Sequence, residues 1–192
     1  MNETSKSIAR RLRDVSYVRW FAGAGIDVGC GHDSLGQWRH LFPGMGTVKG
    51  WDRKQGDAQA LRGIRCGAFD WLHSSHCLEH LYYPHVALRR WCQVVTPGGH
   101  LVVLIPDEDL YEQGKWPPRF NRDHKHTFTL SKRASWSPAS INVFELLAGV
   151  NDLAEPLRVE KLEATYLPLP AGVDQTLNPV TEAAIEFVLR RK

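Results

Sequence analysis

The residues best suited to chemistry lie in the stretch AGAGIDVGCGHDSL, residues 22–35. An apolar run at residues 26–28 is typical of the end of a buried strand, and a Gly-Cys-Gly turn follows it directly. Asp33 or Ser34 then stands where the N-cap of a helix belongs. Glycines permit a tight turn and a close approach to a ligand, and a helix start offers free N–H groups. The stretch therefore predicts a cradle for a nucleotide-like ligand.

The spacing within this cradle narrows the class of ligand. The pattern Gly29-x-Gly31-x-x-Ser34 lacks the third glycine of the dinucleotide-binding fingerprint. Asp27 occupies a strand position that dinucleotide-binding folds keep apolar, because a carboxylate there would repel a pyrophosphate. The same carboxylate suits a ligand that carries an amino group. The pattern points away from a nicotinamide dinucleotide and towards an aminoacyl nucleoside such as S-adenosylmethionine.

Composition limits what kind of protein this is. The 192 residues are 43% hydrophobic and 23% charged, as expected for one ordinary globular domain. A net charge of +3 is too small to indicate a nucleic-acid partner. No apolar run approaches the roughly 20 residues of a membrane span, and no secretory pattern opens the chain, so a cytoplasmic location is expected. The cysteines lack any C-x-x-C pair and are interpreted as reduced thiols, without zinc or disulfides: Cys30, Cys66, Cys77 and Cys92.

Strands alternate with helices along the chain, which predicts an α/β fold. A strand at residues 47–51 ends at Asp52, about 20 residues after Gly29, where a βαβ unit places a ribose-binding acid. The interval before Phe69 is too short for a full helix and strand, so the third strand is expected to be vestigial or absent. Helices are expected at residues 4–21, 35–41, from Pro84 onward and at 139–147, and further strands at 69–74, 100–105, 157–166 and 183–189.

Residues 106–136 change character and contain prolines, aromatic residues and a polar run. A long connection of this kind inside a compact domain is usually functional, so we expect a lid or a substrate-binding loop.

Several short motifs occur in the order found in one known family. On these motifs the chain resembles the class I S-adenosylmethionine-dependent methyltransferases, particularly the small single-domain ones. The matching motifs are Asp27-Val-Gly-Cys-Gly31, Asp52, Gly56-Asp57-Ala58, Phe69-Asp70, Leu78-Glu79-His80-Leu81, Pro97-Gly98-Gly99 and the strand LVVLIP.

The resemblance implies a Rossmann-like three-layer αβα sandwich, with a mostly parallel sheet and an antiparallel last strand. It implies one methyltransferase domain over residues 1–192, with S-adenosylmethionine as cofactor and S-adenosylhomocysteine as product. Asp27, Gly29, Cys30 and Gly31 would then surround the methionine portion. The remaining expected cofactor contacts are Asp52 at the ribose, Asp57 and Ala58 at the adenine, and Ser74, Ser75 and His76 near the reactive methyl group. Arg53 and Gly56 are also expected to contact the cofactor.

Methyl transfer from a sulfonium is an in-line displacement with an activated leaving group. Positioning can supply about 7–11 kcal/mol of barrier reduction, whereas a general base adds a factor of about 10²–10⁴. A hydroxyl acceptor would still need a proton acceptor, and His126, His124 and His76 are the candidates. The string Asp-His-x-His at residues 123–126 is weak spacing for a metal, so no metal site is expected.

The acceptor is expected to be a hydroxyl on a small molecule or a sugar. The chain has no motif typical of enzymes that methylate amino groups on bases, and no nucleic-acid partner is expected. Two alternatives remain: a catalytically silent module that binds the cofactor and serves interactions, and a nicotinamide-dependent oxidoreductase on the same type of sheet.

Overall fold

The computed structural model describes residues 2–170 and 172–192. Its centre is a six-stranded sheet in the order β2-β1-β3-β4-β8-β7. Strands β1 to β4 are mutually parallel, and β8 runs antiparallel to both β4 and β7. This confirms the predicted mostly parallel sheet. The strands are β1 Gly23–Val28, β2 Met45–Trp51, β3 Phe69–Ser75, β4 Val95–Pro106, β7 Ala154–Leu162 and β8 Ala184–Arg191.

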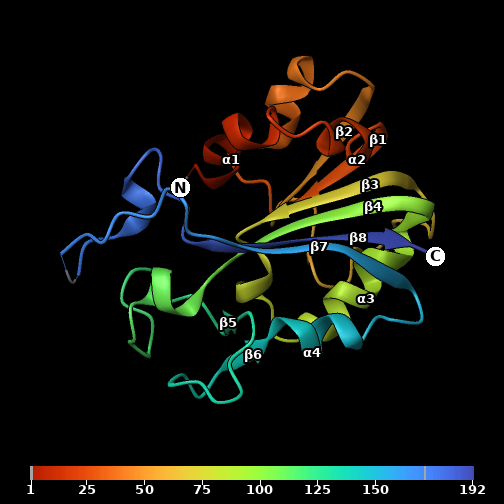
Figure 1. Cartoon of the computed structure of the whole chain (residues 1–192). Helices are drawn as coiled ribbons and strands as arrows, with labels where there is room; N and C mark the ends of the chain where they lie inside the picture. The colour runs from red at the N-terminus through yellow and green to blue at the C-terminus, as the bar shows by residue number, and fades with distance from the viewer. Residues whose placement is uncertain (1, 171) are drawn as a thin grey trace.

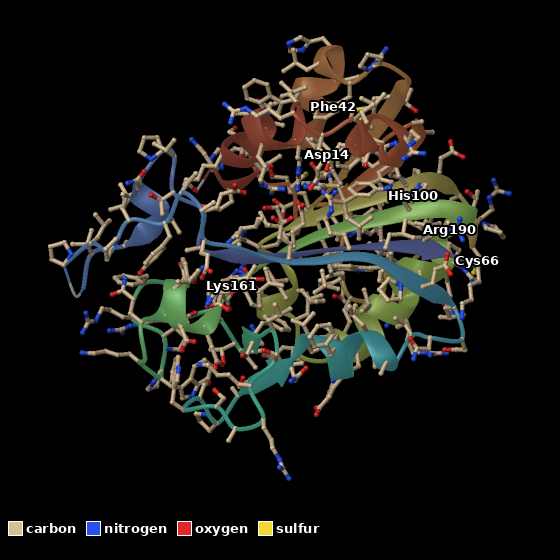
Figure 2. All side chains as sticks on the ribbon, viewed as in Figure 1. Asp14, Phe42, Cys66, His100, Lys161 and Arg190 are labelled. Atoms are coloured by element: carbon tan, nitrogen blue, oxygen red, sulfur yellow. The ribbon has the colours of Figure 1, made fainter. Side chains whose placement is uncertain are left out.

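Helices cover both faces of this sheet (Figure 1). Helices α1 (Glu3–Arg11) and α2 (Ser16–Trp20) lie on one face with the 3₁₀ helix η1 (Leu35–Leu41). Helices α3 (Pro84–Val94) and α4 (Val143–Ala148) lie on the other face. Side chains fill both layers between helices and sheet (Figure 2). The arrangement is the predicted three-layer sandwich.

The sequence of β4 explains why two layers of helices are needed. Leu101, Val103 and Ile105 pack into the core that contains α3 and α4. Val102, between them, packs into the separate core beneath α1 and α2. Alternate side chains of a strand point to opposite faces, so a continuous apolar run is buried only when both faces are covered.

Residues 52–68, all of which the structure describes, contain no strand, so β2 is the sheet edge. The predicted loss of the third strand is confirmed. None of the helices in the described ranges has the length and apolar character needed to cross a bilayer.

Two predicted helices were wrong in extent. The helix expected at residues 4–21 breaks between α1 and α2, where Leu12 and Val15 are exposed. Asp14 ends it locally, because its carboxylate accepts a hydrogen bond from the amide of Ser16 at 2.9 Å. The helix expected at 139–147 begins instead as strand β6 (Ser140–Asn142), which pairs with β5 (Thr127–Thr129), and only then becomes α4.

The long connection at residues 106–136 contains β5 and a π-helical turn, η3 (Glu108–Glu112). The Asp107 carboxylate caps that turn by accepting from the amides of Asp109 and Leu110. These local hydrogen bonds order part of residues 106–136, although the prolines and polar residues there had predicted only a loop.

Candidate active site

Two adjoining hollows, of about 460 and 500 Å³, open where β1, β2 and β3 end. They share the lining residues Gly29, Arg53, His76, His80 and Asp123, so they form one continuous cleft. Ligands of open α/β sheets bind outside the carboxyl ends of parallel strands, and the cleft is in that position.

The glycine turn forms one wall of this cleft. Gly29 has φ +74°, and a Cβ there would lie 2.5 Å from the Cβ of Cys77, so no larger residue fits. Gly31 has φ +50°, with nothing within 4 Å of the position its Cβ would take. Ser34 is the N-cap of η1 and accepts from the amide of Gly36 at 3.2 Å. Asp33 instead accepts from the amide of Ser5 at 2.9 Å, which holds α1 against the turn.

Asp27 lies beneath the turn and lines neither hollow. One carboxylate oxygen accepts from the Ser34 hydroxyl at 2.9 Å and the Leu35 amide at 2.7 Å. The other is 2.7 Å from Nδ1 of His73. The prediction that Asp27 faces a ligand amino group is corrected by this placement, because both oxygens already have partners in the chain. The carboxylate supports the turn from below.

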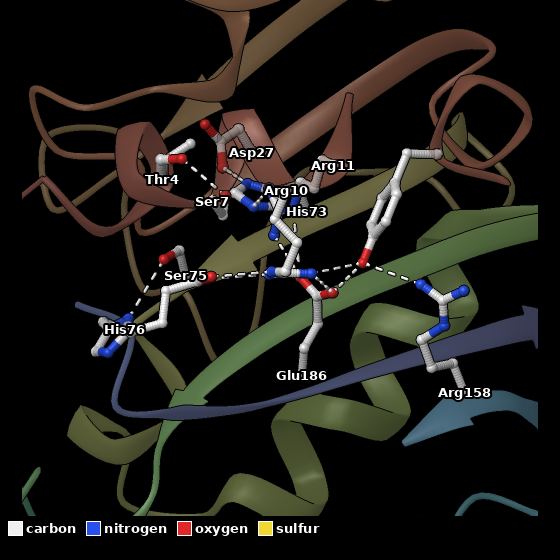
Figure 3. A network of polar contacts seen from close by, with 12 residues as sticks. Thr4, Ser7, Arg10, Arg11, Asp27, His73, Ser75, His76, Arg158 and Glu186 are labelled. Carbon is white, nitrogen blue, oxygen red and sulfur yellow. Dashed lines mark hydrogen bonds and ion pairs between the residues drawn. The ribbon is translucent and has the colours of Figure 1, made fainter. Parts of the chain in front are cut away.

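The bonds continue from Asp27 across the sheet (Figure 3). Nε2 of His73 is 3.0 Å from Nη1 of Arg11, and Nη2 of Arg11 is 2.7 Å from Oε2 of Glu186. A guanidinium can only donate, so Nε2 of His73 accepts and Nδ1 carries the hydrogen donated to Asp27. The glycine turn is thereby tied to α1, β3 and β8.

The second hollow collects the residues predicted for the ribose and the adenine. Asp52 follows β2 directly, and no donor among the described residues bonds its carboxylate, which suits an acid that receives two ribose hydroxyls. The residues of this hollow that were predicted to contact the cofactor are Gly29, Asp52, Arg53, Gly56, Asp57, Ala58 and His76. Gly29, Cys30, Gly31, Arg53, Ser75 and His76 line the first hollow. A carboxylate without a hydrogen-bond donor, close to a glycine turn that lines the cleft, fits the ribose and methionine portions of S-adenosylmethionine.

Ser74 is the second predicted contact that the structure places elsewhere. Its side chain is buried, and the hydroxyl donates to the carbonyl of Val28 at 2.9 Å. Ser74 therefore ties β3 to β1 beneath the cleft.

The three candidate proton acceptors occupy different places. His76 lines both hollows, with φ +50°, a conformation uncommon for a residue with a Cβ. Burial lowers its pKa to about 3, so the ring is neutral at pH 7. His124 is buried behind the cleft, and Nδ1 is 2.6 Å from Oε1 of Glu112. His126 lines a separate hollow beside Tyr82, so the structure does not bring it to the cleft.

Sequence reasoning missed the cleft residues that come from distant segments. Glu3 and Thr4 of α1 line the first hollow, as do Asn121 and Asp123 of the long connection. Burial raises the pKa of Glu3 to about 7, although Lys6 lies 2.7 Å away. No local motif marks these residues, because only the packing of α1 and of the long connection brings them to the strand ends.

Comparisons with known proteins agree with this geometry. A family model described as a methyltransferase domain matches residues 32–103. None of the curated proteins compared with the chain matches it. A solved S-adenosylmethionine-dependent methyltransferase from Mesorhizobium loti is 17% identical, with TM-score 0.61, and the alignment covers 97% of this chain and 98% of that one.

Two further structures share the fold. An S-adenosylmethionine-dependent methyltransferase from Archaeoglobus fulgidus is 14% identical, with TM-score 0.58 and coverage of 98% and 94%. A structure described as the conversion of a disulfide bond into a thioacetal group during echinomycin biosynthesis is 16% identical, with TM-score 0.61 and coverage of 100% and 92%. The matched domain, this shared fold and the cleft of glycines and acids confirm the predicted resemblance. The chain has the fold of the class I S-adenosylmethionine-dependent methyltransferases, and its residues 32–103 match the family model of a methyltransferase domain.

Proposed function

We propose that this protein is an S-adenosylmethionine-dependent methyltransferase that transfers the cofactor's methyl group to a hydroxyl of a small molecule or a sugar. The observation that carries the proposal is the polar lining of the first hollow, which continues from the glycine turn. Acids, imidazoles and an amide surround it, as suits an acceptor with several hydroxyls. The polar residues concerned are Glu3, Thr4, Asp33, Ser75, His76, His80, Asn121 and Asp123.

S-adenosylmethionine supplies an electrophilic methyl group on a sulfonium when it is bound. This chain holds donor and acceptor in line, and such positioning lowers the barrier more than a general base does. Gly29 and Gly31 let the backbone approach the donor, and Asp52 receives its ribose hydroxyls. The hollow beside Ser75 and His76 is left for the acceptor.

His76 is the histidine best placed to orient an acceptor hydroxyl. Its neutral ring can accept a hydrogen bond, and its side chain lines both hollows. A pKa of about 3 makes the ring a weak base. We therefore assign His76 to positioning of the acceptor hydroxyl. Another group must accept the proton of that hydroxyl.

The donor half of the proposal is tested by calorimetric titration with S-adenosylhomocysteine. We expect Asp52→Ala to weaken binding at least about tenfold, which is about 1.4 kcal/mol. Glu145→Ala is the matched control, because this carboxylate is exposed on α4 and lines neither hollow of the cleft. Equal binding by Asp52→Ala and wild type would remove Asp52 from the cofactor site. Failure of the wild-type protein to bind would contradict the donor assignment and redirect work to nicotinamide dinucleotides.

The acceptor half is tested with methyl-labelled S-adenosylmethionine and separate panels of sugars, small hydroxyl compounds, protein and nucleic acid. We expect labelled product from the sugar or small-molecule panel, and at least about a tenfold loss of rate in His76→Ala. Product only from protein or nucleic acid would overturn the proposed acceptor class. Donor binding with no product from any panel would favour the silent binding module.

A further inference from the structure

A cluster of three titratable side chains lies directly behind the cleft, and of these only His124 was among the predicted site residues. Glu79 and His80 end the 3₁₀ turn η2 (Leu78–His80), and His124 reaches them from the long connection. One ligand atom from each of the three side chains lies within 4.8 Å of the others. The Glu79 and His124 side chains are fully buried, and that of His80 is 23% exposed. The sequence offered only the His124–His126 pair for a metal, whereas the fold joins His124 to Glu79 and His80, which are 45 and 44 positions away.

Four buried atoms of this cluster have no hydrogen-bond partner. They are both carboxylate oxygens of Glu79, Nδ1 of His80 and Nε2 of His124. Buried polar atoms are nearly always bonded, because an unmade bond leaves the cost of desolvation unbalanced. Orphaned acceptors that face one another indicate that a cationic partner is missing between them.

A carboxylate lies beside the other ring nitrogen of each imidazole, hydrogen-bonded to it in His124 and within ion-pair distance of it in His80. Nδ1 of His124 is 2.6 Å from Oε1 of Glu112, while its Nε2 is 3.9 Å from Oε1 of Glu79. Nδ1 of His80 is 3.2 Å from Oδ2 of Asp123, while its Nε2 is 3.8 Å from the same Glu79 oxygen. Metal-binding histidines show this pattern, in which one nitrogen contacts a carboxylate and the other faces the ion.

We propose that Glu79, His80 and His124 bind one divalent first-row transition-metal ion, with Zn²⁺ as the reference ion. Two imidazoles and one carboxylate suit this class of ion and leave a coordination position open, as in catalytic zinc sites. Tetrahedral bonds of about 2.0–2.2 Å place ligand atoms roughly 3.3–3.6 Å from one another. Side-chain rotations that close the present separations, 3.8 and 3.9 Å to Glu79 and at most 4.8 Å within the cluster, reach that geometry.

The open position faces the cleft, because His80 is the ligand that lines both hollows. This step rests on the proposed function. An acceptor hydroxyl that takes the open position gives up its proton to water more readily, since a bound dication lowers the pKa of the oxygen it holds. The oxygen then forms a bond to the methyl carbon as the carbon–sulfur bond breaks. The electron pair stays on sulfur, and S-adenosylhomocysteine leaves.

The binding site is tested on the untagged full-length protein after treatment with EDTA and dialysis. Calorimetric titration with ZnCl₂ should give one equivalent bound by the wild type, and at least a hundredfold weaker binding by His124→Ala and Glu79→Gln. His126→Ala is the matched control, because that ring lies outside the cluster, and it should bind as the wild type does. Wild-type protein that binds no ion, or variants that bind equally well, would overturn the site.

A second measurement does not depend on the folding of any variant. Titration of the wild type with CoCl₂ should produce visible absorption bands of a nitrogen- and oxygen-bound site, which ZnCl₂ then abolishes; a spectrum of hydrated Co²⁺ alone would overturn the site. Neither titration needs a methyl donor or acceptor, so the site and the proposed function can fail separately.

The role of the ion in binding the acceptor hydroxyl is tested by activity. EDTA should lower the rate of methyl transfer, ZnCl₂ should restore it, and S-adenosylhomocysteine binding should be unchanged. Equal rates with and without EDTA would overturn that role.

Discussion

Two buried polar clusters, one beside α1 and one behind the cleft, differ in how completely their groups are paired. The α1 network is formed by Arg10, Arg11, His73, Asp27 and Glu186 (Figure 3). Each of its members has a bonded partner from another element. The cleft cluster of Glu79, His80 and His124 instead has four buried atoms without a hydrogen-bond partner.

The difference separates architecture from function. A closed set of charges and hydrogen bonds leaves no position for a ligand, and the α1 network ends at the glycine turn, which it holds in place. An unsatisfied buried set is costly unless something arrives to complete it. A strongly buried histidine and acid are therefore not enough to mark a site, because His73 and Asp27 have both features.

The largest effect should come from breaking the closed network. Arg11→Met removes two hydrogen bonds to Glu186 and one to His73, and both partners are buried. We expect a loss of about 3 kcal/mol in the free energy of unfolding, because His73 loses this donor and Glu186 keeps only Arg10 and Tyr17. Urea unfolding followed by circular dichroism measures it. The matched control is Arg89→Ala, which removes a partly exposed pair with Asp152 and a hydrogen bond to the carbonyl of Gly149, and which should cost much less. A loss in Arg11→Met no larger than in this control would show that the network does not support the fold.

The second effect is the acid sensitivity of the same network. Burial alone would raise the pKa of Glu186. The contacts with Arg11, Arg10 and Tyr17 outweigh this effect and lower the pKa from 4.5 to about 2. The lowered value means that the charged form stabilises the native state above about pH 4.5, and this contribution is lost as the pH falls towards 2. It amounts to about 3 kcal/mol. Urea midpoints at pH 6 and pH 3 should differ more in the wild type than in Glu186→Gln, and equal differences would contradict the assignment.

Much of the fold could be predicted because its signals are local. The apolar run of β4, the glycine turn and Pro84 at the first turn of α3 each follow from neighbouring residues. The loss of the third strand followed from counting residues. The break between α1 and α2 could not be foreseen, because the apolar stripe continues through it and only the Asp14 carboxylate interrupts the helix.

The candidate site was predictable where a motif follows a strand and unpredictable where tertiary packing brings residues together. Asp52 and the glycines line the cleft, as their positions after β2 and β1 required. Asp27 has the same local pattern as a ligand-binding acid, and only the contact with His73 reveals its supporting role. His124 and His126 are nearly equivalent in sequence, yet the loop buries one beside Glu79 and leaves the other near Tyr82.

Removal of a charged group should change the free energy of unfolding in opposite directions in the two clusters. It should lower stability in the α1 network but not in the cleft cluster. Glu79→Gln in EDTA-treated protein removes a buried carboxylate and supplies amide donors that Nε2 of His124 can accept. We expect the free energy of unfolding to stay level or rise by up to about 1–3 kcal/mol. Excess ZnCl₂ should raise the melting temperature of the wild type by mass action and leave the variant unchanged. A loss in metal-free Glu79→Gln as large as in Arg11→Met would mean that Glu79 is paired in solution.

The smallest loss of stability is expected from a substitution at Ser34, where the α1 network meets the glycine turn. Ser34 donates to Asp27 and accepts from the amide of Gly36, so Ser34→Ala removes one cap and one of several bonds to the carboxylate. Because His73 and the Leu35 amide still hold Asp27, we expect a loss of only about 1 kcal/mol in thermal unfolding. Ser34→Thr keeps the hydroxyl and should recover most of the lost stability.

Binding of S-adenosylhomocysteine should weaken less in Ser34→Ala than in Asp52→Ala, because the turn is supported from below by groups that Ser34→Ala leaves in place. A loss of binding equal to that of Asp52→Ala would instead mean that Ser34 contacts the cofactor and that the network reaches into the cleft.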